Sequence, residues 1–206
     1  MAEATRIRLT SEARRASFLD AAARIVADQG PAAVTMEGVA ARTGVNKRLA
    51  YRFFDNRDAL LGQLLERELD EVGRRCRERL PPVPSLEERI AVNVRVWLET
   101  MQARGPLIRL LMDPGVVAAR AFAKYSVADW AAVYQDALGV SDATAEVLAR
   151  IFLGGLQGAV DSLNRGTASL ERVADIYTAA AISAGEAVAA ADPERVAPLA
   201  GPTLSR

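Results

Sequence analysis

The chain has 206 residues, half of them hydrophobic and a quarter charged, which is enough to fold around a substantial core. Lys and Arg number 26, as do Asp and Glu, so the net charge indicates no partner. The absence of histidine excludes Ser-His-Asp and Cys-His catalysis, His-ligated zinc and di-iron bundle sites, and Cys76, the single cysteine, excludes an intrachain disulfide. We expect no metal site and no cofactor.

The N-terminal segment and the most hydrophobic stretch both indicate a cytoplasmic protein without a membrane span. The arginines at positions 6, 8, 14 and 15 are not followed by an apolar run, so they do not begin a secretory signal. The stretch 176–191 is mostly alanine and includes Glu186, which argues against a transmembrane helix.

Apolar residues recur with helical spacing along the chain and no segment alternates with a period of two, so we expect an all-α fold of about nine helices. Ser85, with Glu88 three residues later, has the pattern of a capping box at one helix start. The first helix ends at Gly30-Pro31. Two short helices lie between residues 35 and 54, and the others are predicted at 58–80, 85–104, 107–112, 116–138, 142–164 and 170–190.

These helices group into an N-terminal three-helix domain, residues 1–57, and a larger helical bundle, residues 58–191. The proline-containing tail, 192–206, is expected to be disordered. Residues 1–60 carry ten basic and seven acidic side chains, which leaves sixteen and nineteen for the remainder. A basic N-terminal part joined to an acidic remainder is typical of a protein in which only one end contacts nucleic acid.

The two short helices have the pattern of a helix-turn-helix. Thr35 is the expected N-cap of the first helix, Gly44 lies in the turn, and Asn46 is the expected N-cap of the second, which is predicted over 47–54. In such a motif the second helix enters the major groove of DNA. Its first turn carries cationic side chains here, which can bind guanine or phosphate.

The run TMEGVAARTGVNKRLAYRFFDNRDAL, residues 35–60, resembles without gaps the DNA-binding signature of the TetR family of bacterial transcriptional regulators. The resemblance covers roughly residues 14–65, and beyond them only the size and the helical layout match. It implies DNA contacts at Thr35, Glu37, Asn46, Lys47, Arg48, Leu49, Tyr51, Arg52 and Arg57.

By that resemblance Thr35, Tyr51 and Arg57 would contact phosphates, while Lys47 and Arg48 would lead in reading bases. Glu37 and Arg52 are further base-reading candidates, and the asparagine takes a capping position often filled by serine. Leu49 replaces a small hydroxyl residue, which exchanges one phosphate bond for an apolar contact to a thymine methyl.

These residues also have a purely structural interpretation. A run of cations such as that on the second helix can simply be a solvated face. Tyr51, Phe53 and Phe54 can be core aromatics, and for Phe54 we expect the core. At Tyr51 the position in the motif favours a phosphate contact.

The resemblance further implies a homodimer assembled by the last two helices, and small residues on both helices support it. Gly154 and Gly158 are one turn apart, and Ala180, Ala184 and Ala187 make a similar smooth side. Small side chains let helix axes approach closely across a twofold axis. The alternative is that these faces pack within one subunit.

A small-molecule pocket in each subunit is another implication of the resemblance. Two aromatic stripes and a few polar anchors are its candidate lining, namely Asn93, Trp97, Met101, Phe122, Tyr125, Ser126, Trp130, Tyr134 and Gln157. Aromatic stripes at helical spacing are also the ordinary pattern of a packed core, which is the competing interpretation. A cavity with such a lining would take a largely apolar effector.

We therefore expect a homodimeric repressor that binds double-stranded DNA at a palindrome and is released by a small, largely apolar effector. An activator or co-regulator of the same family would share these features, because the sign of regulation depends on where the operator lies. A helical-bundle enzyme is the remaining alternative. Carboxylates such as Glu66 and Asp70 are explained as surface pairs with Arg67 and Arg74, which argues against it.

Overall fold

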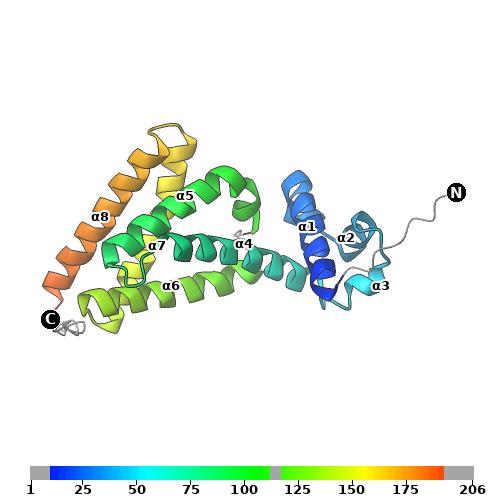
Figure 1. Ribbon diagram of the computed structural model, residues 1–206, viewed down its shortest axis with the longest axis horizontal. Helices are drawn as coiled ribbons and strands as arrows, with labels where there is room; N and C mark the ends of the chain where they lie inside the picture. The colour runs from blue at the N-terminus through cyan, green and yellow to red at the C-terminus, as the bar shows by residue number, and fades with distance from the viewer. Residues whose placement is uncertain (1–9, 112–116, 193–206) are drawn as a thin grey trace. The chain divides into compact units, whose positions relative to one another are not determined.

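The computed structural model describes residues 10–111 and 117–192, without the side chains of residues 106, 109–111 and 117–126. The described residues are helical throughout and contain no strand, which confirms the all-α prediction (Figure 1). The elements in chain order are α1 (Ser11–Gln29), the 3-10 turn η1 (Pro31–Ala33), α2 (Met36–Arg42), α3 (Lys47–Ala50), α4 (Arg57–Arg79), α5 (Leu86–Leu111), α6 (Val117–Leu138), α7 (Asp142–Asn164) and α8 (Leu170–Ala191).

The chain divides into two compact units. The first unit comprises Met1–Leu69 with Pro106–Arg120, and the second comprises Asp70–Gly105 with Ala121–Arg206. The boundary expected at residue 57 falls at the start of α4. The first half of that helix belongs to the first unit, to which it contributes the fully buried Leu60, Leu61 and Leu64.

The first unit is built on the apolar face of α1. Phe18 is fully buried there, and its ring lies 5.4 Å from that of Phe53 and 6.0 Å, edge-on, from that of Phe54. On the other side of α1 an ion pair of 2.7 Å joins Asp20 to Arg67 of α4. These contacts hold α1, the residues after α3 and the start of α4 in one packed body.

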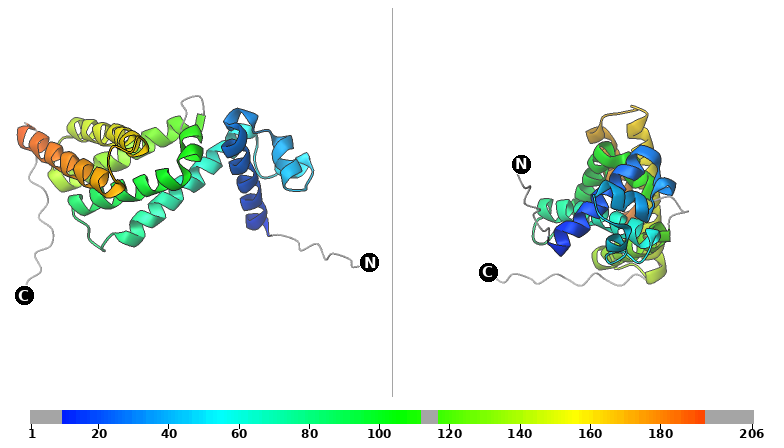
Figure 2. Two further views of the ribbon diagram at one scale, coloured as in Figure 1. Left: turned by 90° about the horizontal axis from the view of Figure 1, so that it is seen from above. Right: turned by 90° about the vertical axis from the view of Figure 1, so that its right-hand side faces the viewer.

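The helices of the second unit run alongside one another, with α7 packed on α8 (Figure 2). Where α4 and α5 pack against each other, Glu99 accepts hydrogen bonds from Arg75 and from both terminal nitrogens of Arg79. Beside them Cys76 is buried in an apolar cluster with Val72 and Val96. Burial raises the pKa of the Cys76 thiol, so the group stays protonated near neutral pH.

Local sequence signals locate most helix ends. The capping box is confirmed, because the Glu88 amide donates to Ser85 Oγ at 3.2 Å and the Ser85 amide donates to Glu88 Oε2 at 2.8 Å. The break predicted at Gly105-Pro106 is wrong, since α5 continues through both residues to Leu111. Proline removes one helical hydrogen bond, yet α5 continues across it with Gly105 buried.

The C-terminal end of the described chain includes the residue Asp192 and the apolar helix α8. Asp192 was expected in the disordered tail, but its carboxylate accepts hydrogen bonds from the Ser141 amide at 2.9 Å and hydroxyl at 3.2 Å. Residues 193–206 of that tail lie outside the described residues. In the described part of the chain one helix, α8, is long and apolar enough to cross a membrane on length and composition alone, which is weak ground for a span.

The packing of α7 against α8 depends on Gly155. A Cβ atom at that position would lie 2.6 Å from the Tyr177 hydroxyl oxygen and 2.8 Å from Cε2 of the same ring. Tyr177 has little freedom to withdraw, because its hydroxyl donates to the Phe152 carbonyl and its ring lies 5.8 Å from the Phe152 ring.

We therefore expect Gly155→Ala to lower the free energy of unfolding by about 1–2 kcal/mol, the cost of overpacking less the gain in helix propensity. Urea unfolding followed by circular dichroism measures the change. In a Tyr177→Ala background the same substitution should be neutral or stabilising, because the obstructing ring is gone. An equal loss of stability in both backgrounds would contradict the conclusion that the Tyr177 ring obstructs a side chain at position 155.

Candidate nucleic-acid interface

The interface begins at the N-terminus of α2, where the backbone turns into the helix at Thr35. The Thr35 hydroxyl accepts a hydrogen bond from the Gly38 amide at 3.0 Å, so the predicted N-cap is confirmed. Met36, Val39 and Ala40 are buried and anchor α2 in the core of the first unit. Thr35 itself remains exposed at the helix start.

A tight turn connects α2 to α3 and requires a glycine. Gly44 has a φ of 69°, in the left-handed region that side chains disfavour. The Thr43 hydroxyl donates to the Val39 and Ala40 carbonyls, both at 3.0 Å, and thereby closes the end of α2. The turn brings the next helix back against α2, as a helix-turn-helix requires.

The second helix of the motif is shorter than predicted. Asn46 caps it as expected by accepting a hydrogen bond from the Leu49 amide at 3.0 Å, but regular α-helix extends only over Lys47–Ala50. The chain continues to Phe54 in turns, in which the amides of Arg52 and Phe53 bond to carbonyls three residues earlier. The last turn is therefore tightened rather than α-helical.

One side of this short helix is buried and the other faces outward. Ala50 is fully buried and Phe54 is 1% exposed, so the predicted core role of Phe54 is confirmed. Lys47, Arg48 and Arg52 are exposed, and the Tyr51 ring is 43% exposed. An exposed tyrosine in that setting has its hydroxyl available for a partner outside the unit.

Lys47 does not point freely into solvent. Its Nζ forms an ion pair with Glu37 Oε1 of α2 and lies 5.5 Å from the centre of the Tyr51 ring. The hydrogen bond between them lowers the pKa of the Glu37 carboxyl and raises that of the Lys47 amine, so both groups are charged near neutral pH. This pairing joins three of the predicted contact residues in one cluster.

Arg57 is engaged by the backbone of its own unit. Its Nε donates to the Val34 carbonyl at 3.0 Å, one Nη donates to the Pro31 carbonyl at 2.7 Å, and the other bonds to Asp58 at 3.0 Å. The guanidinium thus ties the start of α4 to the segment directly before Thr35. It positions that segment whether or not it also contacts a phosphate.

Arg48 and Arg52 differ from the other cations of the motif. Arg42 is paired with Asp28 at 3.6 Å, while Lys47 and Arg57 are engaged as described above. Among the described residues, neither Arg48 nor Arg52 forms an ion pair or a side-chain hydrogen bond. Two exposed guanidinium groups without a partner inside the unit are therefore placed at and just after α3.

The residues predicted to line a pocket fall into separate places in the second unit. The Asn93 amide donates to Cys76 Sγ at 3.9 Å, and Trp97 packs on the cluster around that cysteine. Met101 is buried farther along α5. Gln157 is exposed and donates to Asp161 at 3.0 Å.

The aromatic stripe of α6 packs against α7 instead of lining the described groove. The Trp130 ring lies 4.2 Å from that of Phe152 and 6.3 Å from that of Tyr134. Tyr134 is 1% exposed, and burial raises its pKa to about 12. The other predicted members of the stripe, Phe122, Tyr125 and Ser126, lie among the side chains that the structure does not describe.

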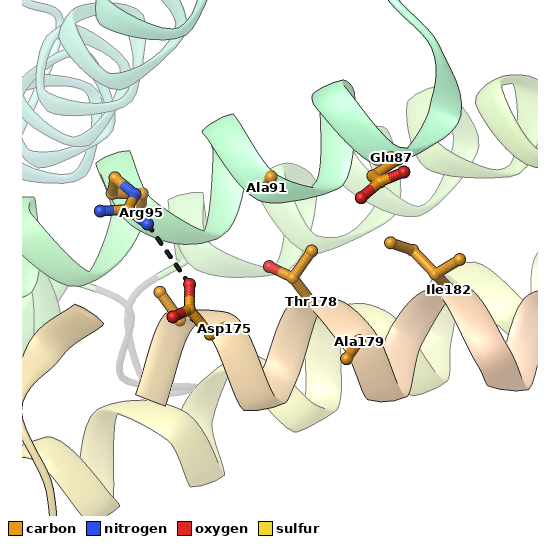
Figure 3. A pocket seen from close by; sticks show the side chains of 8 residues that line it. Glu87, Ala91, Arg95, Asp175, Thr178, Ala179 and Ile182 are labelled. Carbon is orange, nitrogen blue, oxygen red and sulfur yellow. Dashed lines mark hydrogen bonds and ion pairs between the residues drawn. The ribbon is translucent and has the colours of Figure 1, made fainter. Parts of the chain in front are cut away.

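An open groove of about 250 Å³ lies between α5 and α8 (Figure 3). Arg95 and Asp175 face each other across it at 3.4 Å, and Thr178 and Ile182 line the α8 side. None of the six predicted pocket residues whose side chains are described belongs to its lining. Sequence periodicity offered no signal for the groove, because half of its lining is polar or charged and periodicity detects apolar faces.

The residues predicted for a dimer interface are all exposed in the single chain. Gly154 and Gly158 lie on α7 and the three alanines on α8, and none is covered by its own chain. The same two helices carry four of the six exposed large hydrophobic side chains in the described residues, namely Val147, Ile151, Ile176 and Val188. Where exposed apolar side chains form a large contiguous patch, another molecule often covers it.

Comparison with known proteins supports the class that this geometry defines, a helix-turn-helix regulator. The family model for bacterial regulatory proteins of the tetR family matches residues 18–64. An uncharacterized HTH-type transcriptional regulator of Mycobacterium tuberculosis is 28% identical over 129 residues, which are 62% of this chain and 64% of that relative. The chain thus aligns with slightly less than two thirds of that relative's length.

Solved structures agree on the fold at low sequence identity. A TetR-like transcriptional regulator from Rhodococcus is 18% identical, with a TM-score of 0.65 over 86% of this chain and 98% of that one. The fatty acid degradation regulator FadR from Bacillus halodurans is 13% identical, with a TM-score of 0.66 over 84% and 96%. Residues 18–64 thus match the tetR family of bacterial regulatory proteins, and the similar proteins named here are described as regulators.

Proposed function

We propose that the protein is a transcriptional regulator that binds double-stranded DNA through residues 1–57. The observation that carries this proposal is Arg48, which is exposed and has no partner among the described residues, on the capped first turn of α3 within a helix-turn-helix of the TetR type. The positive end of the α3 dipole adds to the attraction for phosphate. Arg48 would then read guanine, and Thr35 and Tyr51 would bind the flanking phosphates.

The remaining predicted contacts have secondary roles in this proposal. Arg52 follows α3 as a second cation without a partner in the described part of the chain. Leu49, which is half-buried, presents an apolar edge to a thymine methyl. Asn46 holds the helix start by its cap. Glu37 and Lys47 enter DNA binding as a pair, and Arg57 supports the segment before Thr35.

DNA binding is tested by selection from a pool of randomised duplexes with the intact protein at low salt. We expect enrichment of a palindrome whose half-sites are one helical turn apart, about 34–36 Å. Binding of the selected duplex should weaken steeply as salt rises, because phosphate contacts release counterions. No enrichment and no retention of any duplex at low salt would refute the proposal.

Tyr51→Phe tests the phosphate contact with a minimal change. Loss of one hydroxyl that donates to a phosphate should reduce affinity for the selected duplex about three- to tenfold, close to 1 kcal/mol. Fluorescence anisotropy against salt concentration measures it. Tyr134→Phe serves as a control, because Tyr134 is buried on α6 of the second unit and should leave the affinity for DNA unchanged.

We also propose that the protein is a homodimer through α7 and α8. The support is the exposed apolar surface on these helices: Val147 and Ile151 are one turn apart on α7, and Ile176 and Val188 lie on α8 with the small residues between them. A second copy related by a twofold axis would cover the same surface on both chains. It would also cover the apolar side of α8, which removes the reason to place that helix in a membrane.

In this proposal the regulator is a cytoplasmic repressor that a small, largely apolar effector releases from DNA. The effector class is supported by FadR, a structural neighbour named for fatty acid degradation. Effector binding would shift the dimer to a form with poor DNA affinity, with a coupling of about 1–3 kcal/mol. A thermal-shift screen of hydrophobic compounds identifies ligands, and footprinting on the native promoter separates a repressor from an activator.

A further inference from the structure

The ion pair between Glu37 and Lys47 connects the two helices of the DNA-binding motif at its exposed side. Glu37 lies in the first turn of α2 and Lys47 is the first residue of α3, and their side chains are 59% and 52% exposed. The lysine amine also lies over the Tyr51 ring. Two attractive partners within the unit therefore compete with DNA for this amine.

The competition for the Lys47 amine reduces the positive charge that the motif offers to DNA. Residues 35–57 contain five cations, Arg42, Lys47, Arg48, Arg52 and Arg57, and two acids, Glu37 and Asp55. Glu37 is the only one of these acids that pairs, within the described residues, with a cation of α3. The pair has no net charge, so the positive charge offered by α3 itself is reduced to that of Arg48.

We propose that Glu37 restrains Lys47, so that Lys47 contacts DNA only by exchanging the carboxylate for a phosphate or base, and that this pair sets the strength and the salt dependence of DNA binding. The inference rests on the proposed DNA-binding function. Glu37 is in this view a positioning residue, which acts on DNA through Lys47. The pair keeps binding to unrelated DNA weak, because nonspecific affinity depends on the number of cations free to meet phosphates.

A purely structural role for the pair makes the opposite prediction. If the ion pair mainly braced α2 against α3, its removal would loosen the motif and weaken DNA binding. If Glu37 restrains Lys47, Glu37→Gln frees a cation and strengthens binding. The sign of the change therefore separates the two roles.

The experiment measures the affinity of the intact protein for the selected duplex and for an unrelated duplex between 50 and 300 mM salt. For Glu37→Gln we expect roughly tenfold tighter binding at 0.1 M salt and a log–log salt slope about one unit steeper per protomer. The gain should be at least as large on the unrelated duplex. Unchanged or weaker binding would overturn the proposal.

A double-mutant cycle with Lys47→Met distinguishes restraint of Lys47 from direct repulsion of phosphate by Glu37. We expect Lys47→Met alone to weaken binding, because it leaves the Glu37 carboxylate unpaired, and the gain from Glu37→Gln to be much smaller than tenfold in its background. A tenfold gain that persists without Lys47 would mean that the carboxylate repels DNA directly, which overturns the proposal. Glu66→Gln, an exposed acid of α4 in the same unit, is the matched control for the change in charge.

The pair can also be measured without DNA. Lys47 and Lys124 are the only lysines, so reductive methylation with ¹³C-formaldehyde gives few NMR signals, and Lys47→Met assigns one of them. The pKa of the Lys47 amine should be higher in the wild-type protein than in Glu37→Gln, and equal values would refute the pair. If the wild-type protein binds no duplex, the proposed function fails; if it binds and Glu37→Gln changes nothing, only this inference fails.

Discussion

Replacement of Ile151 by arginine is expected to convert the proposed dimer into monomers and to reduce its affinity for the selected duplex more than a hundredfold. Ile151 is 60% exposed on α7, between Val147 and Gly154 on the same side of the helix. A buried arginine on each side of a twofold interface would lack a counter-ion, which is strongly unfavourable. A monomer contacts one half-site only and loses the gain of 10²–10⁴ that linked binding sites provide.

Sedimentation velocity measures the first effect, with a wild-type mass of twice 22.1 kDa and a single-chain mass for the variant. Val83→Arg is the matched control, because Val83 is 90% exposed in the connection between α4 and α5 and its replacement adds the same charge outside α7 and α8. An Ile151→Arg protein that remains dimeric would show that the interface lies elsewhere.

Arg48→Ala is expected to cause the largest loss of sequence-specific binding by any change at the DNA surface. A bidentate arginine–guanine contact is worth about 1–3 kcal/mol, so two half-sites would lose about 2–6 kcal/mol, or thirtyfold and more. The folded state should be unaffected, because Arg48 is exposed and pairs with no group among the described residues. Circular dichroism and urea unfolding check that point.

The selected and the unrelated duplex, titrated in parallel, show how Arg48 acts. If Arg48 reads a base, Arg48→Ala should lose more affinity for the selected duplex than for the unrelated one. If Arg48 contacts a phosphate, the variant should lose the same affinity for both duplexes. Arg24→Ala is the control: Arg24 is exposed on α1 and forms no ion pair within the described part of the chain. Wild-type affinity in Arg48→Ala would remove this residue from the interface.

Local signals in the sequence were sufficient to place the DNA-binding motif. Thr35 and Asn46 are caps because a short polar side chain before a helix can bond only to amides a few residues ahead. The capping box at Ser85 and the bounds of α7 are local in the same sense. Each of these features depends on residues within one or two helical turns, so the amino-acid sequence alone is enough to predict it.

The features that the sequence did not predict depend on packing between segments. Gly105-Pro106 has the local pattern of a helix break, but α5 continues through both residues and Gly105 is buried, which the local pattern does not indicate. The Arg57 contact to the Pro31 carbonyl joins residues 26 positions apart. Likewise, the spacing of Trp130 and Tyr134 places both on one face of α6 but does not say that Phe152 lies opposite.

The extreme shortness of α3 has a consequence for how such a regulator is inactivated in cells. Four residues cannot maintain a helix unaided, so α3 depends on the packing of Ala50 and Phe54 in the hydrophobic core for its conformation. A genetic selection for loss of DNA binding would accordingly yield two kinds of allele, one at the outward-facing cations and one scattered through that interior. The second kind would resemble contact mutants in a promoter assay and be told apart by a lowered melting temperature.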